Sequence, residues 1–194
     1  SGRPDGLVFG PAGQLLVGSV DGDRILRYDD AVNFSANHVR TGAGSLSEPA
    51  GLLAGDGTAG GYGDLNGDGV DDLLVASYAN DRVVAYSGDT ASSELNDGSV
   101  IATLVAEGSG GLDGPRGLAY GPDHNLYVAS FNTDQVIRYD GATGATIGVF
   151  AKGKNVEGGW DFAKFIGLDP ENLAFWNISF GQLPPRYSSR ETSL

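Results

Sequence analysis

Three features of the sequence predict an all-β fold built from a repeated unit of short strands. First, residues 4–28 and residues 115–139 align without a gap. Second, glycine makes up 32 of 194 residues, more than twice its usual share of ~7%, which suits many tight turns. Third, each copy divides into short apolar runs separated by turn residues. Because ~45-residue units of three to four strands are typical of propeller blades, we expect a β-propeller or a propeller fragment.

The repeats follow one another in a constant register. Each is expected to begin with a Gly-Leu strand, continue through a Gly-Pro turn into a second strand, and end with a third strand closing on tyrosine. Leucine and tyrosine lie 13 residues apart in every copy, at 15 and 28, 73 and 86, and 126 and 139. A further strand is expected at 99–105 and at 146–150. The three repeats therefore span about residues 3–45, 46–110 and 111–150.

The second repeat carries an insertion between its first two strands. Leu7 and Leu15 are 8 residues apart, as are Leu118 and Leu126, but the corresponding Leu52 and Leu73 are 21 apart. The insertion therefore replaces the hairpin turn of the other copies.

The inserted segment contains an alternating series of oxygen ligands around a glycine turn. Hard Ca²⁺ prefers six to eight oxygen ligands, and alternate acidic or amide side chains beside a sharp turn can supply them. The loop is not an EF-hand, because Val75 stands where the last bidentate glutamate should be. An acidic hairpin without an ion is the alternative interpretation. The expected Ca²⁺ ligands are Asp64, Asn66, Asp68, the carbonyl of Val70, and Asp72.

Residues 151–194 follow the pattern only weakly. Leu173 and Tyr187 are 14 residues apart, close to the repeat spacing, but Pro184 and Pro185 would interrupt the last strand. We expect a degenerate fourth blade or a docking tail. Since propellers have ~4–8 blades, about four repeats would form a small ring or an open arc. An open arc would need a partner chain, a second copy or further sequence to cover its edges.

Residues 3–150 resemble NHL-type repeats and their relatives, the virginiamycin B lyase-like and gluconolactonase-like propellers. The resemblance rests on the Gly-Pro-Arg-Gly-Leu-Ala-Tyr-Gly-Pro phrase at 114–122 and its continuation to Ser130. The inserted loop, with Tyr62 and Gly63 before it, is similar to the calcium loop of FG-GAP repeats. These resemblances imply a propeller; they imply little about activity, because the repeated residues are those that build blades.

The remaining polar candidates favour structural roles. Ser and Asp recur at the same place in each copy (Ser19 and Asp23, Ser77 and Asp81, Ser130 and Asp134), where either a polar ring at one mouth or turn chemistry would fit; we favour the turn. His38 is expected in an irregular stretch and His124 on a hairpin tip, and neither is predicted to be catalytic. No nucleophile elbow, P-loop or dinucleotide fingerprint follows a strand and opens a helix, and neither histidine is paired with an acid at a telling spacing.

Charge and composition restrict the partners. A net charge of −13 argues against nucleic acid and anionic membranes, and no apolar run is long enough to span a membrane. There is no Cys, hence no disulfide framework. Because the chain starts at Ser1 and contains no Met, we expect a processed N-terminus or an excised piece, with a secretion signal lost.

Together these features predict a non-enzymatic, calcium-stabilised propeller module for binding or assembly. We expect it at the cell surface, outside the cell or in the periplasm, with a protein or glycan partner. One alternative is a metal-dependent lyase or lactonase with its site in the central channel. The other is a self-assembling subunit that associates through open blade edges or through residues 151–194.

Overall fold

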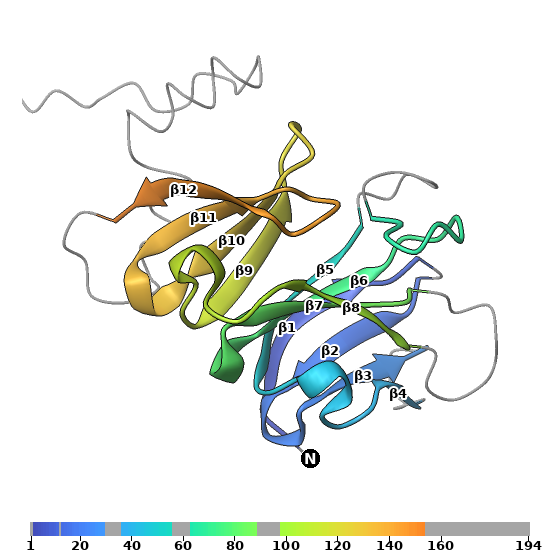
Figure 1. Cartoon of the computed structure of the whole chain (residues 1–194). Coiled ribbons are helices and arrows are strands. Elements are labelled where there is room, and N and C mark those ends of the chain that lie inside the picture. Colours follow the sequence, from blue (N-terminus) through green and yellow to red (C-terminus); the bar gives the residue numbers. More distant parts are fainter. Residues whose placement is uncertain (1, 12, 30–35, 56–62, 89–97, 154–194) are drawn as a thin grey trace, which may run out of the picture. The chain divides into compact units, whose positions relative to one another are not determined.

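The computed structural model describes residues 2–11, 13–29, 36–55, 63–88 and 98–153. All lie in the first of the two units, 1–158 and 159–194, into which the chain divides. They form three four-stranded antiparallel sheets (Figure 1). The described residues contain no α-helix, only short 3₁₀ turns, and no helix among them is long and apolar enough to cross a membrane. The all-β prediction is therefore confirmed; residues 154–194, with their expected fourth blade or docking tail, lie outside the described part.

Each sheet is a simple meander in which strands adjacent in sequence are paired. The first contains β1 (Pro4–Phe9), β2 (Leu15–Ser19), β3 (Arg24–Tyr28) and β4 (Ala36–Val39). The second contains β5 (Pro49–Ala54), β6 (Leu73–Ser77), β7 (Arg82–Tyr86) and β8 (Val100–Val105). The third contains β9 (Pro115–Tyr120), β10 (Leu126–Ser130), β11 (Gln135–Tyr139) and β12 (Thr146–Lys152).

The constant spacing between leucine and tyrosine has a direct structural cause. In each sheet these two residues are cross-strand partners at the open end of the central hairpin, as in Leu126 and Tyr139. The closed end is a 3₁₀ turn: η1 (Val20–Gly22), η3 (Tyr78–Asn80) or η5 (Phe131–Thr133). The aspartate after each turn is left-handed, with φ of 46° at Asp23, 54° at Asp81 and 53° at Asp134. Asp tolerates this conformation better than most residues, which accounts for its recurrence.

The two faces of each sheet have different partners. We call face A the side that carries the leucine of the Gly-Leu motif (Leu7, Leu52, Leu118), and face B the opposite side; directly paired residues share a face. Face B of the first sheet packs against face A of the second. Their shared core contains Val8, Leu16, Ile25 and Val39 from the first sheet, and Leu52, Leu73, Val75, Val84 and Tyr86 from the second.

The second and third sheets repeat the same contact. Face B of the second sheet packs on face A of the third, so successive sheets stack in one sense, as the blades of a propeller do. The shared core contains Leu53, Leu74, Val83, Ala85 and Val105 from the second sheet, and Leu118, Tyr120, Leu126, Val128, Ile137 and Tyr139 from the third.

Glycine at the bulge of the first strand allows successive sheets to approach closely. The pairing register shifts at this point in all three sheets. A Cβ atom on Gly6 would overlap the backbone carbonyl of Ala50, and one on Gly51 would overlap that of Arg116. Glycine is thus required at this point because the backbone of the next sheet occupies the space of a side chain.

One strand lies where the sequence indicated irregular structure. His38, expected in an irregular stretch, is on β4 and is 1% exposed. The expectation was wrong because the four residues of β4 are too few to show a strand alternation, and pairing with β3 rather than local propensity determines their conformation.

Candidate functional site

The inserted loop joins β5 to β6 in the second sheet. Strand pairing closes on both sides of it, with Leu53 opposite Leu74 and Ala54 opposite Leu73. The N–H of Asp72 then donates to the carbonyl of Gly63 at 2.7 Å, which fixes the base of the loop. Residues 63–72, including all five expected ligands, are described; Tyr62 lies outside the described residues.

Asp64 organises the turn through its carboxylate. Its Oδ1 accepts the N–H groups of Gly67 at 2.7 Å and Asp68 at 3.0 Å, and its Oδ2 accepts that of Gly69 at 2.9 Å. Gly67 and Gly69 have φ of 78° and 86°, in the left-handed region that glycine adopts without strain. The backbone is therefore wrapped around the first acidic residue of the loop.

Asn66 brings the other two carboxylates of the loop together. Its amide nitrogen donates to Oδ2 of Asp68 at 2.8 Å and lies 3.4 Å from Oδ1 of Asp72. Its amide oxygen accepts the N–H of Asp68 at 2.8 Å. One hydrogen-bond donor thus stands between two acidic groups, so the loop contains a place where positive charge would be stabilised.

Asp72 is the most buried of these acids, at 1% exposed. Its Oδ2 accepts the N–H of Leu65 at 2.7 Å and its Oδ1 that of Gly88 at 3.3 Å. Burial raises the pKa of Asp72, backbone hydrogen bonds partly oppose this, and the nearby negative charge of Asp68 raises it further. A buried carboxylate supported only by neutral donors is less stable than one paired with a cation.

The donor set suits Ca²⁺ in composition, with one change of geometry. The five expected ligands lie in one short loop, and none of the described residues donates a hydrogen bond to the carbonyl of Val70. Asn66, however, presents its amide nitrogen to the two carboxylates, and an ion would require its oxygen there. Throughout the described part of the chain, no three His, Cys, Asp or Glu side chains by themselves form a group able to hold a metal. Binding would therefore depend on Asn66 and on the backbone as well as on the acids.

The adjacent Asp71 has a different environment. It is 9% exposed and lies against Gly55, where a Cβ atom would come within 2.6 Å of its carboxyl carbon. Consecutive residues near a strand point to opposite sides, which separates Asp71 from the side chain of Asp72.

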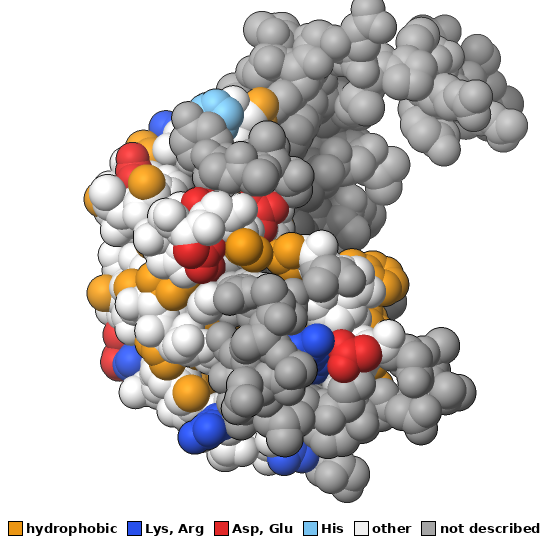
Figure 2. Space-filling model, turned by 90° about the vertical axis from the view of Figure 1, so that its right-hand side faces the viewer, with side chains coloured by type: hydrophobic (Ala, Val, Ile, Leu, Met, Phe, Trp, Pro, Cys, Tyr) orange, Lys and Arg blue, Asp and Glu red, His pale blue; other side chains and the backbone are white. Residues whose placement is uncertain are grey.

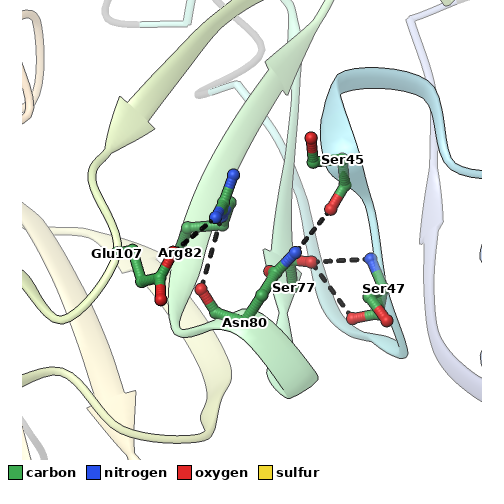
Figure 3. A network of polar contacts seen from close by, with 6 residues as sticks. All are labelled: Ser45, Ser47, Ser77, Asn80, Arg82 and Glu107. Carbon is green, nitrogen blue, oxygen red and sulfur yellow. Dashed lines mark hydrogen bonds and ion pairs between the residues drawn. The ribbon is translucent and has the colours of Figure 1, made fainter.

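The recurrent serines fasten the chain that enters each sheet. The hydroxyl of Ser77 accepts the N–H of Ser47 at 2.8 Å and donates to its carbonyl at 3.0 Å (Figure 3). Ser130 makes the same two bonds with Asp113, at 2.9 and 3.1 Å. These two serines bond to backbone within their own repeat, but to the segment before its first strand, 30 and 17 residues away, rather than to the local turn that the sequence suggested.

Further polar contacts in Figure 3 attach the connecting segment to the second sheet. The Asn80 amide donates to the carbonyl of Ser45, at the end of η2 (Ala43–Ser45). Arg82 donates to the carbonyl of Asn80 at 3.3 Å and to the carboxylate of Glu107 at 2.7 Å. These bonds attach the segment before β5 and the segment after β8 to the turn that follows β6.

The recurrent aspartates connect one sheet to the next. Asp23 accepts the N–H of Glu48 at 2.8 Å, and Asp81 accepts that of Gly114 at 2.7 Å. Each of these N–H groups belongs to the residue just before the proline that begins the following sheet. The sequence suggested local turn chemistry for these aspartates, but two of them also form bonds between sheets. The recurrence of the aspartate together with a proline at the start of each sheet was the available signal, although 25 residues separate the bonded pair in one case and 33 in the other.

A cluster of one arginine and two aromatic rings at the junction of the second and third sheets was not anticipated from the sequence; the rings of Tyr78 and Phe131 are 6.4 Å apart and inclined at 64°. The guanidinium carbon of Arg116 lies 5.0 Å from the ring centre of Tyr78 and 4.4 Å from that of Phe131. Both rings follow the recurrent serine of their repeat. Since the first repeat has Val20 there, the sequence could have indicated an aromatic pair but not the cation that lies over both rings.

The histidines are far from the loop in sequence and differ in environment. His38 lies on β4 and is buried, whereas His124 occupies the turn between β9 and β10 with φ of 62°.

On the face shown in Figure 2, Lys and Arg side chains appear as separate spots rather than one continuous area.

Comparison with known proteins supports the propeller fold and shows nothing about the activity of this chain. No protein-family model matches the sequence, and no curated relative matches it. An inactive variant of virginiamycin B lyase from Staphylococcus aureus, solved with quinupristin, is similar over 78% of this chain and 42% of its own, at 18% identity and a TM-score of 0.52. The PQQ-bound aldose sugar dehydrogenase from Streptomyces coelicolor matches over 73% and 46%, at 23% identity and a TM-score of 0.47, too low for any argument. The chain thus spans less than half of either structure, and the first likeness shows a propeller fold.

Proposed function

We propose that this chain is a non-enzymatic propeller module, stabilised by Ca²⁺ in the loop between β5 and β6, that binds a protein or glycan outside the cytoplasm. The observation that carries the proposal is the placement of Asp72, which is buried beside Asp68 with an amide nitrogen as their common donor. Calcium would replace that weak donor with two positive charges. It would also order a long hairpin whose closure costs entropy.

The proposal is tested by thermal unfolding in millimolar calcium and in EDTA. A ligand that binds only the folded state adds ~2.7 kcal/mol at a hundredfold excess over its dissociation constant. For a domain of this size, that corresponds to a rise in melting temperature of roughly 5–10 °C. The variant Asp68→Ala should abolish the calcium-dependent rise.

A matched control separates loss of a ligand from loss of a turn. Asp140 is an exposed turn carboxylate between β11 and β12 that accepts the N–H groups of Ala142 and Thr143 at 3.2 and 2.8 Å. Asp140→Ala should lower stability in both solutions and leave the calcium effect intact. If Asp68→Ala keeps the full calcium effect, or if wild-type protein shows none, the loop is only an acidic hairpin.

The enzymatic alternative requires a divalent ion elsewhere. A metal-dependent propeller lyase or lactonase would hold its ion in the central channel, apart from residues 64–72. Titration calorimetry with calcium and manganese distinguishes the two proposals. Loss of all divalent binding in Asp68→Ala supports the calcium module, and a site that survives this substitution supports the enzyme.

A further inference from the structure

Face A of the first sheet lacks the cover that the same face has in the other two sheets. Leu7 and Phe9 on β1 are each 68% exposed. Leu15, Val17, Leu26 and Tyr28 complete this face and are only half-buried. Their counterparts in the third sheet, Leu126, Val128, Ile137 and Tyr139, are all 0% exposed. No described residue outside the first sheet forms a comparable apolar core on this face.

The two interfaces within the chain indicate what kind of surface fits there. In both, face A is covered by face B of the preceding sheet. Face B of the third sheet has no following sheet in the described part of the chain, and it carries Ala119, Tyr127, Ala129, Arg138 and Val136, of which Val136 is 7% exposed. The chain therefore presents both halves of its own recurring interface.

The hydrogen bond that joins successive sheets also has one partner at each end of the described chain, an acceptor in the third sheet and a donor residue before the first. Asp23 and Asp81 each accept an N–H from the residue before the next sheet, but no described residue donates to the side chain of Asp134 at the same position. At the other end, the residue equivalent to Glu48 and Gly114 is Arg3. Its N–H donates to Asp21 at 3.1 Å, and its exposed guanidinium pairs with the same carboxylate at 2.9 Å. An exposed anion and an exposed cation thus occupy the places where this bond would form.

We propose that face A of the first sheet binds face B of the third sheet of a second copy of this chain, with Asp134 of one copy bonded to Arg3 of the other. The contact is heterologous, because different surfaces of the two copies meet. It closes into a ring if the rotation per copy allows, and otherwise continues as a filament. The inference does not depend on calcium, since the loop between β5 and β6 contributes none of these residues.

The test is analytical ultracentrifugation of the full chain over a wide range of concentration, with calcium present. Wild-type protein should associate reversibly into dimers or larger species. The double variant Leu7→Asp, Phe9→Asp should sediment as a monomer, because two charges would be buried against an apolar face. Asp134→Gly, which keeps the left-handed turn at φ of 53° without strain, should weaken association about tenfold, the usual effect of removing one charge-assisted hydrogen bond.

Two controls distinguish this interface from nonspecific hydrophobic association and from unfolding of the variant. Ile147→Asp alters an apolar residue of β12 that is 46% exposed but lies at the outer edge of its sheet, and it should leave association unchanged. Unfolding curves should show that the Leu7 and Phe9 variant stays folded, since both side chains are exposed in the protomer. A monomeric wild-type chain, or association that survives the double substitution, would overturn the proposal.

Discussion

The hydrogen bond from Gly114 to Asp81 offers a direct measurement of the coupling between adjacent sheets. Asp81→Gly removes the carboxylate that accepts this N–H at 2.7 Å. Glycine adopts the left-handed conformation at φ of 54° without strain, so the backbone of the turn is preserved. Alanine would add a conformational cost of its own and is the poorer choice.

The expected loss follows from the kind of bond. A hydrogen bond to a charged group contributes about 1.5–3 kcal/mol, and partial exposure of this one places it near the lower end. A loss of about 1.5 kcal/mol would lower the melting temperature by roughly 3–6 °C in a domain of this size. Because the bond joins two sheets, the third sheet should unfold before the first two as this coupling weakens.

Asp134→Gly is the matched control. It makes the same change in the same turn at φ of 53°, and so raises the entropy of the unfolded chain equally. Urea unfolding of both variants, in EDTA and at a concentration where sedimentation shows protomers only, gives the coupling as their difference. Equal losses in the two variants would refute the assignment of Asp81 as a bond between sheets.

Two further predictions concern the packing between sheets. Burial raises the pKa of Tyr86 and Tyr139 above the usual 10.0, so these phenols stay neutral in the folded state while the unfolded chain ionises, and stability should fall as pH rises above 10. The double variant Tyr86→Phe, Tyr139→Phe should lose about 1 kcal/mol per hydroxyl at neutral pH yet show a flatter alkaline decline in urea unfolding; an unchanged decline would contradict this cause. Gly51→Ala should cost about 2 kcal/mol through overlap with the Arg116 carbonyl, measured by urea unfolding, whereas Gly42→Ala, with φ of 69° and no atom within 4 Å, should cost about 1 kcal/mol; equal costs would count against the overlap.

The fold class could be predicted because the residues that recur are the ones that the backbone conformation and the strand pairing require. The glycine that begins each Gly-Leu strand, the leucine and tyrosine that pair at the hairpin end, and the left-handed aspartate all recur at fixed spacing. The leucine, the tyrosine and the aspartate are required by geometry inside one repeat, whereas the glycine is required by the backbone of the next sheet. β4 was missed because its conformation is imposed by pairing with β3.

The candidate site was located by its spacing, but its present arrangement could not be read from sequence. Alternation placed Asp64, Asn66, Asp68 and Asp72 in one turn. It did not indicate that Asn66 donates through nitrogen to two carboxylates, or that Asp72 is buried while Asn66 and Asp68 are exposed. Those facts depend on how β5, β6 and the segment after β7 pack, which no local pattern encodes. The contacts of Arg116 with the rings of Tyr78 and Phe131 likewise join residues from different repeats.

The two contacts between successive sheets are alike, and this similarity would let such a protein gain a whole sheet by duplication. Because the first and second sheets each offer face B and an aspartate to the sheet that follows, a gene segment that encodes one sheet could be copied in tandem. The new copy would find compatible neighbours on both sides without further substitution. Diversification could then proceed in the turns, as in the second repeat, where an insertion of acidic and glycine residues between β5 and β6 left the pairing of Leu53 with Leu74 in register.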